Sequence, residues 1–101
     1  MSILSLDPVA ASLPRRHGFF RFRVRDIAET LELEVSDIPR GTSTSEVAQA
    51  MALRMELPGE IAYALRDERS GQWLKDDLAL DSQLNDNTDV SLRLTPKARL
   101  G

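Results

Sequence analysis

Cysteine is absent from this sequence of 101 residues, and histidine occurs once, as His17. Without cysteine the chain has no disulfides, thiolate metal sites or thiol nucleophiles, which fits a reducing compartment, so we expect a cytoplasmic protein. A lone histidine in an N-terminal tail gives no general base for a folded site. Carboxylates such as Asp76, Asp77 and Asp86 fall in polar loops, where solvated or capping roles are usual. We therefore predict no enzymatic activity, no metal and no cofactor.

The sequence also lacks a long apolar run and a strong excess of one charge. Residues 3–13 are mildly apolar, but Asp7 and Pro8 interrupt them and two arginines follow, so no signal peptide is predicted. No run approaches membrane-spanning length. The 13 basic and 16 acidic residues leave a formal charge of −3, which disfavours bulk attraction to nucleic acid. We expect a single small domain, monomeric when free, that binds neither membrane nor nucleic acid.

Residues 1–17 are predicted to form a flexible N-terminal extension. They contain Pro8 and Pro14 and no sustained apolar period. Apolar side chains such as Ile3 and Leu6 leave open a second interpretation, in which this segment binds a partner. The folded domain is then expected at residues 18–95.

Two alternating segments at the start of the domain predict a β-hairpin. Residues 20–25 read F-R-F-R-V-R and residues 30–35 read T-L-E-L-E-V, with apolar side chains on one face of each segment. Antiparallel pairing with the apolar faces together places arginines opposite glutamates. Arginines beside Phe20 and Phe22 could also form a platform for single-stranded nucleic acid. We prefer the hairpin, because its register turns both rings into the core.

A single helix is predicted after the hairpin. The S-T-S-E sequence at residues 43–46 has the form of a capping box, which opens helices. Val47, Ala50 and Met51 then recur at helical spacing, until L-P-G at residues 57–59 stops the helix. This helix is expected to cover the sheet.

The second half of the chain reads as short strands separated by loops. Alternation predicts strands at residues 61–66, 72–74 and 90–94, and Leu78, Leu80 and Leu84 are expected to pin the intervening loop onto the core. The residues expected to share this core are Phe22, Val24, Leu33, Val47, Met51, Leu65, Leu84 and Leu92. Beyond the last strand, Pro96 removes a ladder donor and K-A-R-L-G has no period, so residues 96–101 are predicted to be a flexible C-terminal arm.

The order of hairpin, helix, short strands and final strand resembles the β-grasp fold of the ubiquitin-like protein family. Residues 44–66 align with ubiquitin without a gap, through the capping cluster, Val47 and Met51 in the helix, and L-P after it. The L-x-x-x-L of Leu80 and Leu84 and the final V-x-L-x-L also match the family's pattern. The resemblance implies an α+β fold, with a mixed four- to five-stranded sheet covered by one helix.

The resemblance also implies a protein modifier, of a bacterial kind. A dedicated activating enzyme would adenylate the carboxylate of Gly101, a conjugating enzyme would join it to a target protein by an isopeptide bond, and a deconjugating peptidase would remove it. Lys97, Arg99 and Leu100 would be recognised by the activating enzyme, and Lys75 would be a candidate acceptor lysine. The alternative is a non-covalent adaptor that docks a partner through its sheet surface. A sulfur carrier is a lesser variant.

Two features depart from ubiquitin. The family's main modifiers end in two glycines, whereas this sequence ends in Leu100-Gly101, which favours a dedicated activating enzyme. The apolar patch through which ubiquitin is usually bound would be built here around Ile27 and Leu65, but its position on the last strand is Arg93. Proteins that bind ubiquitin would then have to desolvate a charge. The predicted partner surface is Ile27, Leu65 and Arg93.

Overall fold

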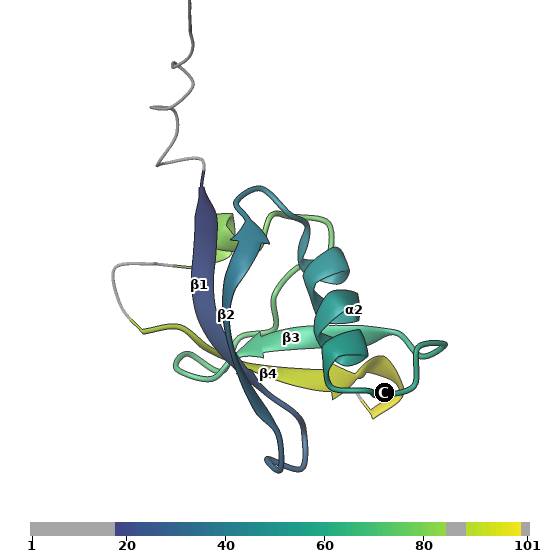
Figure 1. Cartoon of the computed structure of the whole chain (residues 1–101). Coiled ribbons are helices and arrows are strands. Elements are labelled where there is room, and N and C mark those ends of the chain that lie inside the picture. The colour runs from purple at the N-terminus through teal and green to yellow at the C-terminus, as the bar shows by residue number, and fades with distance from the viewer. Residues whose placement is uncertain (1–17, 85–88, 100–101) are drawn as a thin grey trace, which may run out of the picture.

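A four-stranded sheet with one helix on one face forms the body of the molecule (Figure 1). The structure, a computed structural model, describes residues 18–84 and 89–99. Its elements in chain order are β1 (Phe19–Arg25), β2 (Glu32–Pro39), α2 (Thr44–Arg54), β3 (Tyr63–Asp67), the 3-10 helix η2 (Asp81–Gln83), β4 (Ser91–Pro96) and the 3-10 helix η3 (Lys97–Arg99). The strand order is β2-β1-β4-β3, with β1 and β4 parallel and the other pairs antiparallel. This confirms the predicted mixed sheet, with four strands. The predicted extension at residues 1–17 lies outside the described residues.

The β1–β2 hairpin has the register that the charge pattern predicts. Arg23 faces Glu34 and Arg25 faces Glu32 across the two strands. The register shifts once, between Phe20 and Phe22, so β2 carries an additional residue there. Such a bulge changes which side chains face inward, and it allows both Val35 and Ile38 to be buried although they are three positions apart.

Helix α2 begins and ends as its flanking residues require. The Ser43 hydroxyl accepts a hydrogen bond from the Glu46 N–H at 3.3 Å, which is the capping interaction that S-T-S-E predicts. At the other end Glu56 has a φ of 60°, and the Leu57 N–H donates to the Ala52 carbonyl at 2.9 Å. This left-handed turn closes the helix shortly before Pro58.

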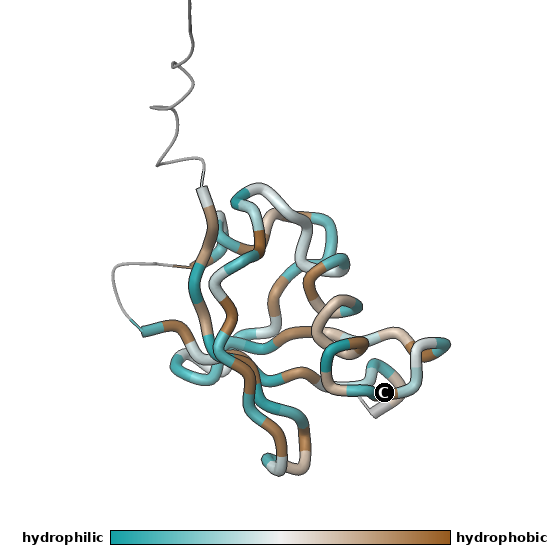
Figure 2. Tube along the Cα trace, viewed as in Figure 1, coloured by the Kyte–Doolittle hydropathy of each residue, from teal (hydrophilic) through white to brown (hydrophobic). Residues whose placement is uncertain are grey.

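The core lies between α2 and the inner face of the sheet. Apolar and polar residues alternate along the strands, so each strand turns one face to this core (Figure 2). Of the predicted core residues, Phe22, Val24, Val47, Met51, Leu65 and Leu92 are buried, whereas Leu33 and Leu84 pack against the core and are only partly buried. Leu80 is buried as expected, but Leu78 is exposed, so its predicted role as a plug is wrong. Residues 72–74 form no strand; they make one isolated bridge, between Trp73 and Arg66.

The chain stays in the fold further than the sequence predicts. Strand β4 includes Pro96, which pairs with Tyr63, and η3 continues to Arg99. The Lys97 N–H donates to the Ala62 carbonyl at 2.9 Å, and the Lys97 ammonium pairs with Asp76. Residues 96–99, predicted as the start of a flexible arm, thus belong to β4 and η3, because a proline at the end of a strand need not break its pairing. The flexibility of this arm stays a prediction.

Candidate functional site

Three arginines lie side by side on the outer face of the sheet, the face away from α2. In the strand register Arg93 of β4 is opposite Arg25 of β1 on one side and opposite Arg66 of β3 on the other. We call these three residues the arginine row. Like charges directly opposite one another destabilise a sheet unless counter-ions compensate them. The row therefore needs local carboxylates, and it is an unusual arrangement for a merely structural surface.

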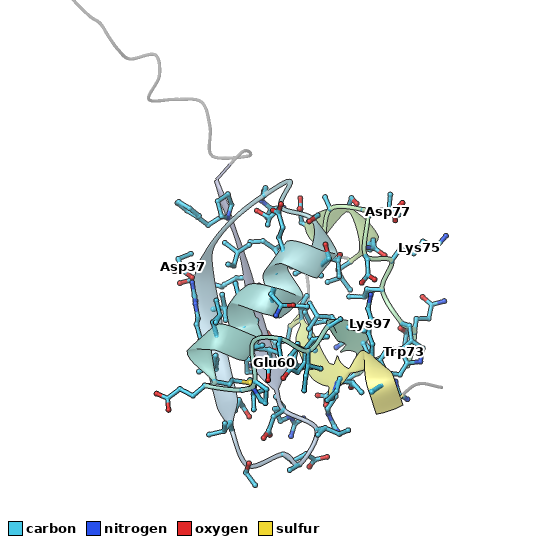
Figure 3. The ribbon with its side chains drawn as sticks, turned by 90° about the vertical axis from the view of Figure 1, so that its right-hand side faces the viewer. Asp37, Glu60, Trp73, Lys75, Asp77 and Lys97 are labelled. Carbon is cyan, nitrogen blue, oxygen red and sulfur yellow. The ribbon has the colours of Figure 1, made fainter. Side chains whose placement is uncertain are left out.

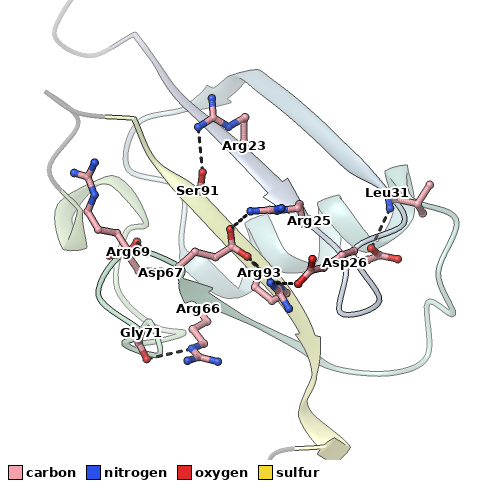
Figure 4. A network of polar contacts seen from close by, with 12 residues as sticks. Arg23, Arg25, Asp26, Leu31, Arg66, Asp67, Arg69, Gly71, Ser91 and Arg93 are labelled. Carbon is pink, nitrogen blue, oxygen red and sulfur yellow. Dashed lines mark hydrogen bonds and ion pairs between the residues drawn. The ribbon is translucent and has the colours of Figure 1, made fainter.

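Glu68 and Glu29 compensate two members of the row, Arg25 and Arg93. Figure 4 labels these two arginines and marks their ion pairs with dashed lines. One Glu68 oxygen lies 2.8 Å from the Arg25 guanidinium and the other lies 2.8 Å from that of Arg93. Glu29, in the turn of the hairpin, lies 2.7 Å from Arg93. Burial raises the pKa of the Glu68 carboxyl, but hydrogen bonds from Arg25 and Arg93 and their positive charges outweigh burial and leave that pKa lowered. Glu68 is thus an ionised bridge between two arginines.

Arg66, at the other end of the row, has a different environment. Its Nε donates to the Gly71 carbonyl at 3.2 Å, and its guanidinium lies 5.5 Å from the centre of the Trp73 ring. No carboxylate of the described residues lies within 4.0 Å of this guanidinium. Trp73 is itself 45% exposed. A cation and an indole face are therefore presented together at the β3 edge.

The arginine row borders a hollow on the sheet surface. The hollow has a volume of about 320 Å³, is open to solvent and is lined by Arg25, Arg66, Glu68 and Arg93. Its polar walls and surplus of guanidinium groups suit an anionic group of a partner better than an apolar one. No group of three or more acidic or histidine side chains that could hold a metal ion occurs in residues 18–84 and 89–99. The described helices include none long and apolar enough to cross a membrane.

Solved structures of low sequence identity share this arrangement of elements. The UBL domain of Dsk2 from Plasmodium falciparum matches with a TM-score of 0.55 and 17% identity, over 76% of this chain and 99% of that chain. The C-terminal ubiquitin-like domain of mouse tubulin-specific chaperone e matches with a TM-score of 0.52 and 14% identity, over 83% of this chain and 94% of that chain. A ubiquitin-like domain in a splicing factor matches with a TM-score of 0.53 and 17% identity, over 90% of this chain and 82% of that chain. The chain has the ubiquitin-like β-grasp fold.

Sequence comparison adds nothing to this assignment, since no family model and no curated protein matches the ubiquitin-like chain. The predicted resemblance to ubiquitin-like proteins is thus confirmed by the fold.

The three residues of the predicted partner surface of this ubiquitin-like domain do not lie on one exposed face. Ile27 lies in the hairpin turn and is 38% exposed, and Arg93 lies at the centre of the arginine row. Leu65, however, is 0% exposed and belongs to the core, so its assignment to a surface patch is wrong. Strand alternation is the reason: Leu65 shares the inner face with Tyr63, and the next residue, Arg66, takes the outer position.

Two of the residues predicted for activation and conjugation, Lys75 and Lys97, lie at or beside the loop that carries Asp76. Figure 3 shows Lys97 between the C-terminal helix η3 and the loop that carries Lys75 and Asp77. Lys75 is exposed, which an acceptor lysine requires, and its role stays a prediction. Arg99 is the last described residue, and Leu100 and Gly101 lie outside the described residues.

The sequence prediction missed Arg25, Arg66 and Glu68 as members of this site. The alternation in each strand already placed Arg25 and Arg66 on the polar face. Their alignment with Arg93 depends on β1 pairing with β4 and β4 pairing with β3, with one particular register in each pair. Pairing between distant strands carries no local signal, so the row could be found only from the assembled sheet.

Proposed function

We propose that this ubiquitin-like domain binds other proteins non-covalently through the outer face of its sheet, over β3 and β4. The observation that carries the proposal is the exposed pair of Arg66 and Trp73 at the edge of the arginine row. Arginine and tryptophan are enriched at the energetic centres of protein interfaces, because they combine a large contact area with directed hydrogen bonds. The similar structures support it too, since each is named as a ubiquitin-like domain of a larger protein.

The charge of this face limits the kind of partner. A partner with an apolar contact surface would remove water from Arg66 and Arg93 without supplying hydrogen-bond acceptors in its place. This desolvation costs about 2–5 kcal/mol. Partners that bind ubiquitin through an apolar patch are therefore expected to bind this domain poorly. The domain is expected to act as a binding module without catalysis of its own.

A covalent modifier is the second candidate. It requires that Gly101 carry the free carboxylate of the mature chain and that the segment from Lys97 onward enter an activating enzyme. The sequence Arg99-Leu100-Gly101 supports this candidate, with Lys97, Arg99 and Leu100 as recognition residues. The contacts of Lys97 with Ala62 and Asp76 oppose it in part, because η3 would first have to detach.

Capture of an N-terminally tagged protein from its own cells under two conditions separates the candidates. A non-covalent partner is retained in native buffer and lost after boiling in detergent, whereas a covalent adduct survives boiling. We expect partners that are retained only in native buffer, that are lost with Arg66→Glu and that persist when Gly101 is deleted. Arg66 is exposed, so the fold of the variant should survive, which a thermal melt checks.

Two results would reverse this order of candidates. Adducts that survive boiling and disappear when Gly101 is deleted would establish the modifier. An intact mass in which the chain extends beyond Gly101 would instead exclude activation at that residue.

A further inference from the structure

We propose that the partner's contact segment is an acidic peptide, whose carboxylate pairs with Arg66 while a neighbouring apolar side chain packs on Trp73. This inference rests on the proposed function and adds the chemistry of the partner. It is carried by the distribution of charge across the outer face of the sheet and by the exposed side chains at one edge of that face.

The charge on the outer face changes sign from one edge of the sheet to the other. Strand β2 contributes the exposed Glu32 and Glu34, which face Arg25 and Arg23 of β1. At the centre, Glu68 and Glu29 pair with Arg25 and Arg93. Within the arginine row, Arg66 of β3 is therefore the member without a described carboxylate partner. An anionic segment is attracted to the β3 and β4 side and repelled from β2, which fixes its position on the sheet.

The guanidinium of Arg66 is held in place by two contacts, and neither contact uses its terminal N–H donors. Its Nε is used by the Gly71 carbonyl, and the ring of Trp73 supports one face of the group. No carboxylate of the described residues lies within ion-pair distance of its remaining N–H groups. A guanidinium fixed in this way loses little conformational entropy when it binds a carboxylate with two parallel hydrogen bonds.

Trp73 supplies the apolar part of the contact. Nearly half of its surface is exposed, although burial of an indole removes a large apolar area from water. The partner segment that fits both groups carries Asp or Glu next to a Leu, Ile or Phe. A bare phosphate chain would satisfy Arg66 but would leave the Trp73 ring without an apolar contact.

Fluorescence of Trp73 reports this contact directly, because it is the only tryptophan in the chain. The probe is a short synthetic peptide of alternating Glu and Leu, and its control has Gln in place of Glu. We expect the Glu peptide to change the emission of Trp73, to bind at least about tenfold more tightly than the Gln peptide, and to weaken as salt is raised.

Substitutions at Arg66 test whether the peptide binds at the arginine row. Arg66→Gln should weaken binding of the Glu peptide by about tenfold or more, and Arg66→Lys, which keeps the charge but not the planar group, should weaken it less. Arg21→Gln is the matched control: it removes the same charge from an exposed position on β1 outside the row, and it should leave binding within about twofold.

Four outcomes would overturn the inference. In the first, the Glu and Gln peptides bind equally well; in the second, the Arg66→Gln and Arg21→Gln variants lose the same amount of binding. In the third, the protein binds single-stranded DNA through Arg66 and does not bind the peptide. In the fourth, the protein self-associates through Arg66 and does not bind the peptide. Native capture that depends on Arg66, combined with any of these, would leave the proposed function standing and reject only the acidic partner. Loss of native capture altogether would reject the proposed function.

Discussion

Asp26 holds the hairpin turn together with both oxygens of its carboxylate. One oxygen accepts hydrogen bonds from the N–H groups of Thr30 and Leu31, at 2.8 and 3.0 Å, and the other accepts the Thr30 hydroxyl at 2.9 Å. Burial raises the pKa of Asp26, but these hydrogen bonds outweigh it, so the pKa lies below its usual range. The same turn carries Glu29, which reaches Arg93. Asp26 therefore stabilises the fold and also positions a neighbour of the arginine row.

Replacement of Asp26 by alanine is expected to reduce the free energy of unfolding by about 1–3 kcal/mol at neutral pH, since the partly buried N–H groups of Thr30 and Leu31 lose their acceptor. Asp89→Ala is the matched control, because the Asp89 side chain is 83% exposed and lies 4.0 Å from Arg23. It should change stability by less than about 0.5 kcal/mol. Urea denaturation measures both, and equal effects would contradict the role of Asp26.

The effect of Asp26→Ala should also depend on pH in a defined direction. A carboxyl whose pKa is lowered in the folded state adds stability above its unfolded pKa, about 3.9 for aspartate, and this stability is lost as the pH falls through the lower folded value. The difference between wild type and Asp26→Ala should therefore be complete at pH values above about 5 and shrink in more acidic urea titrations. A difference that grew on acidification would show that the carboxylate is not stabilised in the fold.

Strand β4 and helix η3 show where local sequence signals fail at the scale of an element. The alternation of Val90, Leu92 and Leu94 predicted the strand and its buried face correctly. The end of the strand was predicted too early, because the interactions that hold Lys97 come from Ala62 and Asp76, which are distant in sequence. The bounds of helix α2 were easier to predict, since its capping serine and its left-handed closing turn lie next to the helix in sequence.

The docked state of Lys97 can be measured from its backbone amide. We expect an order parameter for Lys97 close to that of β4, about 0.8 or more, because the N–H is bonded to Ala62 and the ammonium to Asp76. Asp76→Ala should lower the values for residues 97–99 and leave those of β4 unchanged. An order parameter below about 0.6 for Lys97 in the wild type would restore the flexible arm from residue 96 and would favour the modifier.

The arginine row on the outer face of the sheet depends on the whole molecule and cannot be predicted from single strands. Local signals in the sequence were enough to predict the hairpin, the helix and most of the core, and the resemblance to the ubiquitin-like family supplied the topology. The arginine row required the register of three strands, and the error at Leu65 arose because a one-residue change along a strand exchanges the inner and outer faces. The ubiquitin-like framework can thus be predicted from sequence patterns, whereas the charge arrangement on its outer face depends on the assembled sheet.

Photo-crosslinking in the protein's own cells tests the central claim, that partners bind the outer face of the sheet beside the arginine row. A photoreactive phenylalanine derivative replaces Arg69, exposed in the turn after β3, or, as a control, Leu53, exposed on α2 at the opposite side of the molecule. The account predicts adducts from position 69 that disappear with Arg66→Glu, and none from position 53. Adducts from position 53 alone, or adducts from position 69 that are indifferent to Arg66→Glu, would contradict it.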